Sequence, residues 1–339
     1  MAQVTRPAHA FALLSAISFS MAAGVGMAQQ RPIAAMFSDD QKRDPALALS
    51  FLQVDLPASK AAGFPAQVYL SAGDLERAFD RRDFRPDAAI IPTNTDLMLT
   101  APAPGTQRVL VDRVQKQAEV MRDLEEQIAI RRKQSSAPSG EPGLLRIGVD
   151  SFVAQLPRRA DGEERNGAFP KAACFVATDF AKGGAIDRRE LFAQDRLRKG
   201  IADCLTALDA AGAQSLALPL LGAASGGTQT NDALLEGQRV LMECRLINAT
   251  AGIALGIHDF AVGRRNLREI GLVQWDRELA TMFKVPSGSR VASAAQAAYR
   301  VYAEQIKQAF QKGLAGEKTT QSDVSGSCSA ILNVRGGLD

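Results

Sequence analysis

The chain has 339 residues, of which 46% are hydrophobic and 23% charged, with a formal net charge of +3 at pH 7. This composition is typical of a globular protein, and the length fits one large domain or two small ones. Such a small positive charge excludes the strongly basic surface of most nucleic-acid-binding proteins, so we expect no nucleic-acid partner.

The first 28 residues have the pattern of an export signal. One basic residue, Arg6, precedes an apolar run from Phe11 to Ala23, and Gly26-Met27-Ala28 supplies small residues at the positions that a signal peptidase reads. Three serines keep the run short of the roughly 20 apolar residues that span a bilayer. We therefore expect a signal peptide at residues 1–28 and a periplasmic or secreted mature chain without a membrane span.

After a polar lead-in at residues 29–45, strand and helix patterns alternate. Apolar runs at Leu47–Leu56 and Gln67–Leu70 predict strands, and Ala72-Gly73-Asp74-Leu75 turns the chain into a short helix through about Asp83. Asp87 to Pro92 has the short apolar pattern of a buried strand and ends in the polar residues 93–96.

A long helix is predicted over residues 109–134, where Leu110, Val114, Met121, Leu124 and Ile128 recur at helical spacing. The near-heptad part of this spacing would suit a partner helix and thus a homo-oligomer, while packing along the chain's own sheet is the favoured alternative. With the Pro- and Gly-rich connector that follows, the helix forms an insertion at residues 108–143.

The second half continues the alternation. Strands are predicted within residues 144–156 and at Ala172–Ala177, and a helix at Leu197–Asp209. A strand at Ser215–Pro219, a helix near Asp232–Cys244 and a strand around Gly252–Ile257 follow. This order predicts a layered α/β domain over residues 46–275. Beyond it, we expect an amphipathic helix ending near Gly313 in a C-terminal extension, residues 276–314, and a flexible tail, residues 315–339.

Histidine and cysteine limit the chemistry. His258 is the single histidine left after processing, which excludes metal sites built from several histidines, and we expect neither a metal nor a cofactor. Its surroundings suggest a strand end, where a hydrogen-bonded structural histidine is favoured over a base. Cys174 and Cys204 are either buried free thiols or bridged, and a Cys204–Cys244 bridge stays open.

A buried-strand run ends directly in a loop of small residues. Ser215–Leu221 is followed by Gly222, Ala223, Ala224, Ser225, Gly226 and Gly227. Glycine lets backbone N–H groups approach an anion closely, so the loop favours a phosphate-bearing ligand over an ordinary strand-to-helix turn.

Three segments in this order resemble the macro domain family, whose members bind ADP-ribose and related nucleotides: Gly73-Asp74-Leu75, Asp87–Asn94 and Pro219–Gly227. The likeness spans roughly Val68 to Phe260. It implies a three-layer α/β fold, with a mixed central sheet flanked by helices. The long inserted helix and the C-terminal helix are additions to that fold.

The resemblance also implies residue roles. Asp74 and Leu75 would hold the adenine, Asn94 the distal ribose, and the backbone amides of Gly222–Gly227 the diphosphate. Asp74 is equally suited to cap a helix, and Asn94 to form a turn. Phe260 could stack on the adenine, although a core position is favoured.

The sequence departs from the family pattern at its second motif. Ile91 stands where many members have a first asparagine, Pro92-Thr93 replace small residues, and the usual run of glycines after Asn94 is missing. Asn94 and Asp96 are the candidate catalytic residues if turnover occurs. We expect an exported protein that binds ADP-ribose or a related adenine nucleotide derivative without turnover. The alternatives are a hydrolase of ADP-ribosyl or related nucleotide bonds, and an envelope interaction protein whose pocket is not functional.

Overall fold

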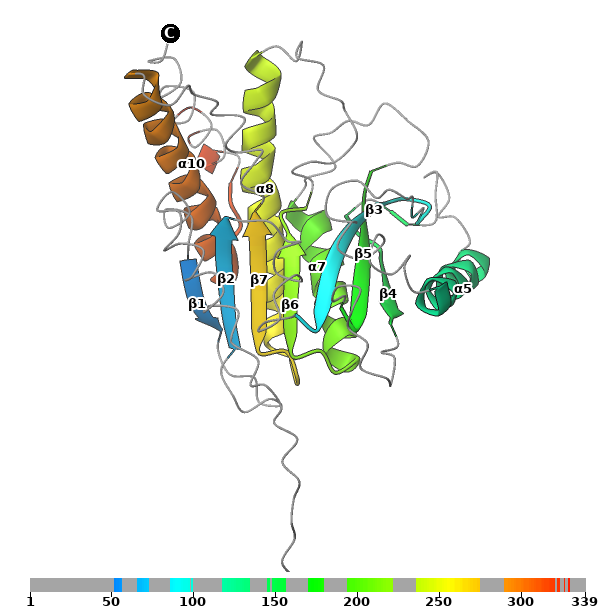
Figure 1. The fold of residues 1–339 in the computed structure, drawn as a ribbon. Coiled ribbons are helices and arrows are strands. Elements are labelled where there is room, and N and C mark those ends of the chain that lie inside the picture. The colour runs from blue at the N-terminus through cyan, green and yellow to red at the C-terminus, as the bar shows by residue number, and fades with distance from the viewer. Residues whose placement is uncertain are drawn as a thin grey trace, which may run out of the picture.

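The structure is a computed structural model that describes residues 52–56, 66–72, 86–97, 99, 118–134, 145–146, 148–156, 170–179, 194–221, 236–274, 290–320, 322–323, 326 and 329. Seven strands in these ranges form one sheet, in the order β1-β2-β7-β6-β3-β5-β4 (Figure 1). The strands are β1 (Leu52–Leu56), β2 (Ala66–Ala72), β3 (Ala88–Asn94), β4 (Ser151–Gln155), β5 (Ala172–Asp179), β6 (Ser215–Pro219) and β7 (Glu269–Gln274). The helices are α5 (Ala118–Gln134), α7 (Gln194–Ala210), α8 (Glu236–Ala261) and α10 (Arg290–Leu314).

The sheet is mixed, with a parallel centre and two antiparallel edges. The centre consists of five mutually parallel strands, in the order β2, β7, β6, β3 and β5. At the two sides, β1 pairs antiparallel with β2, and β4 pairs antiparallel with β5. The carboxyl ends of the five parallel strands therefore lie at one edge of the sheet, which we call the carboxyl edge. The opposite edge is the amino edge.

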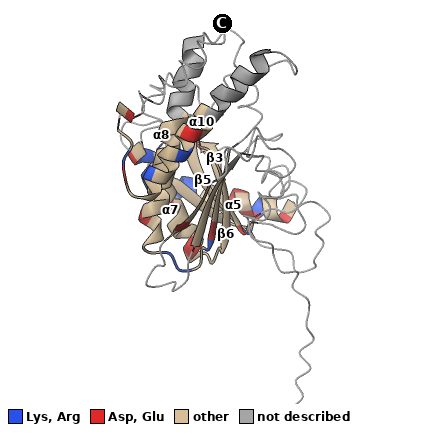
Figure 2. Ribbon diagram, turned by 90° about the vertical axis from the view of Figure 1, so that its left-hand side faces the viewer, with Lys and Arg blue, Asp and Glu red and all other residues tan. Residues whose placement is uncertain are grey.

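Helices cover both faces of this sheet. In Figure 2 the sheet is seen edge-on, with α7, α8 and α10 on one side and α5 on the other. The predicted α/β fold with a mixed sheet flanked by helices is thus confirmed, and α5 and α10 are its additional helices.

The predicted strand around Gly252–Ile257 is wrong, because these residues belong to α8, and the strand comes later as β7. Every residue from Ala249 to Ile257 is buried, since α8 contacts α7 and α10 as well as facing the sheet. A helix that is apolar all round has no 3.6-residue pattern, so its sequence resembles a buried strand. A Cβ atom at Gly256 would lie 2.7 Å from the carbonyl oxygen of Arg198, so the glycine permits close packing of α7 and α8.

Helix α5 packs on its own sheet. Val120, Leu124 and Ile128 are buried in the core, and the Gln127 side chain bonds the backbone of Gln155 in edge strand β4 twice. Its Nε2 donates to the Gln155 carbonyl oxygen at 2.8 Å, and its Oε1 accepts from the Gln155 N–H at 3.1 Å. The helix thereby satisfies part of the free edge of β4. A homo-oligomer through this helix stays a prediction.

Residues 315–320, which the sequence analysis assigned to a flexible tail, are held against the helical layer. Gln194 donates from its side chain to the Thr319 carbonyl oxygen at 2.7 Å and accepts from the Thr319 N–H at 3.1 Å. His258 lies in α8 rather than at a strand end, and its Nδ1 is 2.9 Å from the Leu314 carbonyl oxygen, which is a structural role. No helix in the described part of the chain is long and apolar enough to cross a membrane.

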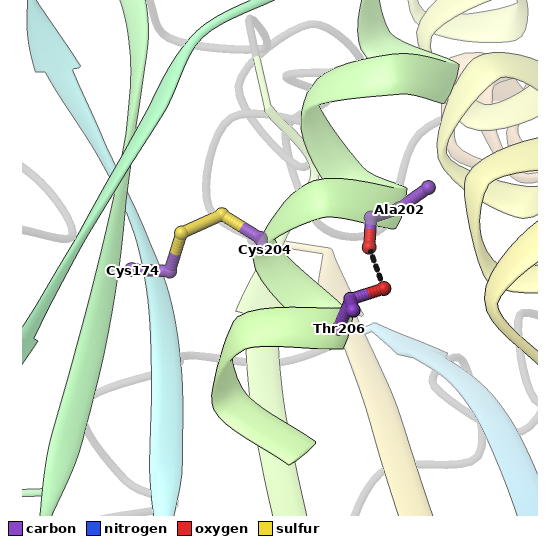
Figure 3. Close-up of a disulfide and its surroundings, with 4 residues drawn as sticks. All are labelled: Cys174, Ala202, Cys204 and Thr206. Atoms are coloured by element: carbon purple, nitrogen blue, oxygen red, sulfur yellow. Dashed lines mark hydrogen bonds between the residues drawn. A yellow bond between two sulfur atoms is a disulfide. The ribbon is translucent and has the colours of Figure 1, made fainter. Parts of the chain in front are cut away.

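A disulfide joins Cys174 of β5 to Cys204 of α7, with Cα atoms 5.8 Å apart (Figure 3). This pairing replaces the free thiols and the Cys204–Cys244 bridge that the sequence left open. Both cysteines are completely buried, and Figure 3 also shows Thr206 of the same helix donating to the Ala202 carbonyl oxygen. The bridge fixes β5, the neighbour of edge strand β4, to the helical layer.

Candidate functional site

The connections of the sheet reverse direction between β6 and β3. From β6 the chain returns through α8 to β7 on one side, whereas from β3 it proceeds past α5 and β4 to β5 on the other. In open α/β sheets, ligands bind outside the carboxyl ends of strands at such a switch point. The register between β3 and β6 covers two residue pairs, Ala88–Leu216 and Ala89–Ala217, and the strands then diverge toward the carboxyl edge (Figure 1).

The predicted ligand-binding segments follow strand ends at this edge. Asn94 ends β3, and the Gly222–Gly227 loop follows β6 after Leu221. Asp74 and Leu75 follow the end of β2, which is separated from β6 by β7 alone. Asn94 lies within the described residues, whereas Asp74, Leu75 and the Gly222–Gly227 loop lie outside them.

Asn94 forms a tight turn. Its side-chain Oδ1 accepts a hydrogen bond from the Asp96 N–H at 3.1 Å, and its carbonyl oxygen accepts one from the Leu97 N–H at 3.1 Å. Leu97 is buried at φ +54°, a left-handed conformation that non-glycine residues rarely adopt. The turn role that the sequence allowed for Asn94 is therefore observed, and it fixes the side-chain amide at the carboxyl edge. Its ligand role stays a prediction.

An arginine from α5 holds this turn from the other side. Arg132 donates from Nη2 to the Asp96 carbonyl oxygen at 3.1 Å and to the Leu97 carbonyl oxygen at 3.4 Å. The inserted helix thus brings a guanidinium group to the segment where the family pattern has glycines. Hydrogen bonds therefore fix both the N–H and the carbonyl oxygen of Asp96. Its half-buried carboxylate is not assigned a role by these contacts.

A second segment joins the carboxyl edge between β3 and β5. The Leu145 N–H donates to the Thr95 carbonyl oxygen at 2.9 Å, and the Gly148 N–H donates to the Ala177 carbonyl oxygen at 2.8 Å. Arg146 forms a bidentate pair with Asp150, at 3.0 Å and 2.8 Å. This hydrogen bonding from Arg146 holds the pKa of Asp150 below its usual value, against the opposing effect of burial.

The first residue of the second motif has a structural role at the amino edge. The Asp87 carboxylate is buried, pairs with Lys171 at 2.8 Å and accepts from the Gln214 N–H at 3.2 Å. Its backbone N–H donates to the Ser215 hydroxyl at 3.0 Å. Asp87 therefore joins the starts of β3, β5 and β6, and it lies a full strand length from the candidate site.

Phe260 does not belong to the candidate site. It was predicted to follow a strand end, but it lies in the last turn of α8, where it is 4% exposed. Helix α8 ends at the amino edge, because β7 begins there after a short loop. Phe260 is therefore a core residue, and it does not stack on a ligand at the carboxyl edge.

One cleft among the described residues lies at the amino edge instead. Its volume is about 560 Å³, within the range of small-molecule sites, and α5 and the turn after α7 form its walls. Its polar groups include Asp123 and Glu126 of α5 and the paired Asp87 and Lys171. Carboxylates dominate these groups, so the cleft is poorly suited to a phosphate ligand.

Arg132 and Thr93 were not predicted from the sequence as residues of the site. Arg132 lies among several charged residues at the end of the predicted helix, and its contact with the Asn94–Leu97 turn joins segments 35 residues apart. Thr93 was noted merely as a replacement for a small residue. It is 3% exposed, and its hydroxyl has no hydrogen-bond partner in the described structure.

The sequence matches no protein-family model and no curated protein. Similar solved structures include two of the Oceanobacillus iheyensis macrodomain, an asparagine-to-alanine mutant and the macrodomain with ADP. Both are 10% identical to this chain, and each match covers 77% of it. The mutant has a TM-score of 0.40 and is covered over 95% of its own chain. For the macrodomain with ADP these values are 0.41 and 98%. Thermosipho africanus DarTG in complex with ADP-ribose is 12% identical, with a TM-score of 0.34, covering 65% of this chain and 43% of that chain. The two Oceanobacillus iheyensis structures are macrodomains, and they overlap loosely with this chain.

Proposed function

We propose that this protein binds ADP-ribose or a related adenine nucleotide derivative at the carboxyl edge, between the ends of β6 and β3. One observation carries the proposal. The switch point of the sheet lies between the strand that leads into the glycine-rich loop and the strand that ends in Asn94. Two motifs that resemble nucleotide-binding segments in sequence thus flank the place where this topology binds ligands.

Each motif then has a chemical task. The backbone amides of Gly222–Gly227 would bind the diphosphate, because closely spaced N–H groups form an anion site. Asp74 and the Leu75 N–H would bind the exocyclic amine and a ring nitrogen of adenine. Asn94, whose side chain is oriented by its turn, would bind the distal ribose.

We propose binding without turnover. The glycine run after Asn94 is replaced by a turn whose backbone is fixed by Arg132 and by the buried Leu97. Asp96 is the carboxylate nearest to Asn94 in sequence, and its backbone is held on both sides of that turn. A rigid turn positions a ligand well, and its described hydrogen bonds involve the Asp96 backbone and do not direct the carboxylate toward the site.

The disulfide supports export. Disulfides persist in oxidising compartments and are rare in the reducing cytosol, and Cys174–Cys204 is buried in the centre of the domain. Together with the signal-like first 28 residues, this bridge supports a periplasmic or secreted protein. A related nucleotide derivative outside the cytoplasm is then the natural ligand class.

Calorimetric titration with ADP-ribose tests the proposal. We expect saturable binding that Asn94→Ala weakens about tenfold, the effect of losing one good hydrogen bond. Asn266→Ala is the matched control, because Asn266 is an exposed asparagine at the amino edge and its loss should leave the affinity unchanged. Folded protein that shows no binding at millimolar ADP-ribose refutes the function. Release of free ADP-ribose from an ADP-ribosylated substrate, abolished in Asp96→Ala, refutes the absence of turnover.

A further inference from the structure

Thr93 carries a buried hydroxyl that the folded chain does not satisfy. The residue is 3% exposed, and its Oγ1 has no hydrogen-bond partner in the described structure. Buried polar groups are almost always hydrogen-bonded, and leaving one without a partner destabilises the folded protein. A valine would fill nearly the same space without this cost, so the hydroxyl needs an explanation.

The position of Thr93 supplies one. It is the last residue of β3 before Asn94, and the register between β3 and β5 shifts at this step, from Thr93–Ala177 to Asn94–Asp179. Such irregularities re-aim side chains and are frequent beside functional sites. Thr93 also lies beyond the point where β3 and β6 stop pairing, so it is at the diverging, carboxyl end of the switch point.

The register also places Thr93 on a defined face. Cys174, which is opposite Ile90, is bonded to α7, so alternate residues of β3 face that helix. Thr93 is opposite Ala177, which is three residues after Cys174. Because successive side chains of a strand point to opposite faces, Thr93 lies on the face away from α7, with Ile91 and Phe175. The neighbouring part of that face is apolar, because Phe175, opposite Ile91, stacks on Phe152 with ring centroids 6.1 Å apart.

We propose that the Thr93 hydroxyl is a ligand-binding group that hydrogen-bonds a hydroxyl of the distal ribose. A threonine hydroxyl both donates and accepts, and so does a ribose hydroxyl, which makes the two matched partners. This inference rests on the proposed function, in which the neighbouring Asn94 binds the same sugar. The unsatisfied hydroxyl lowers the stability of the free protein and gains its partner when the ligand binds.

Thr93→Val tests the contact, with ADP-ribose and ADP as ligands, because ADP lacks the distal ribose. We expect the variant to bind ADP-ribose about tenfold more weakly than the wild type and to bind ADP equally well. Thr93→Ser keeps the hydroxyl and should restore most of the ADP-ribose affinity. In thermal melts without ligand, Thr93→Val should unfold at the same temperature as the wild type or higher, because a methyl group replaces an unsatisfied hydroxyl.

Thr319→Val is the matched control. Its hydroxyl is also buried without a partner among the described residues, but it lies on the helical layer beside Gln194. We expect no change in the affinity for either ligand. Equal ADP-ribose binding by wild type and Thr93→Val overturns the inference while leaving the proposed function intact. Equal weakening toward ADP-ribose and ADP overturns the ribose contact. A wild type that binds neither ligand overturns the proposed function and this inference together.

Discussion

Removing the disulfide gives a stability change that can be worked out from its place in the chain. Cys174 and Cys204 are 30 residues apart, and closing a loop of this length in the unfolded chain corresponds to about 3.6 kcal/mol at 25 °C by the chain-entropy relation. Both residues are completely buried and joined across the β5–α7 contact. We therefore expect Cys174→Ala/Cys204→Ala to lower the free energy of unfolding by about 2–4 kcal/mol.

Urea denaturation of the oxidised wild type, the reduced wild type and the double variant measures this change. Reduction should lower the stability of the wild type to nearly that of the variant, and the variant itself should not respond to reductant. Each single alanine variant should lose almost as much as the double, because either change removes the whole bridge. A wild type that is insensitive to reductant, or single-variant losses that add to give the double, would refute the link between β5 and α7.

Two further predictions concern packing and charge. Gly256→Ala should destabilise the protein by about 1–3 kcal/mol in urea denaturation, because its Cβ would lie 2.7 Å from the Arg198 carbonyl oxygen and 2.8 Å from the Ile201 Cβ. Gly263→Ala, whose Cβ would lie 3.9 Å from the Phe260 carbonyl oxygen, should change stability by less than about 0.5 kcal/mol, and equal losses would contradict close α7–α8 packing. Arg146 lowers the pKa of Asp150, so this pair contributes stability above the unfolded carboxyl pKa of about 3.9 and loses it as pH falls through the lower, folded value. The stability difference between wild type and Asp150→Asn should therefore be full at neutral pH and vanish in strong acid; a difference independent of pH would contradict the ion pair.

Much of the fold was predictable because its elements have the usual periodicity. Strand β6 is a short apolar run next to turn residues, and α7 presents Leu197, Ile201, Cys204 and Leu208 at helical spacing. Helix α8 was misread in part because it is buried on several sides, and its Gly252 and Gly256 serve packing rather than a turn. The cysteine pairing depends on a strand–helix contact that spacing in the sequence does not encode.

The candidate site was predictable to a smaller extent. The position of Asn94 at the end of a buried strand followed from the polar residues after the apolar run. The contact of Arg132 with the turn is long-range, and its residue type is common on any exposed helix face. Thr93 had no signal in the sequence, because an unsatisfied hydroxyl is a property of the packed structure. Phe260 was misplaced together with the strand that was expected before it.

A crystal structure of the protein with ADP-ribose would test the location of the site most directly. We predict electron density for the ligand at the carboxyl edge, between the Gly222–Gly227 loop and Asn94, with the distal ribose next to Thr93. Density in the cleft at the amino edge beside Asp87 and Lys171, with the carboxyl edge empty, would contradict the site proposed for this fold.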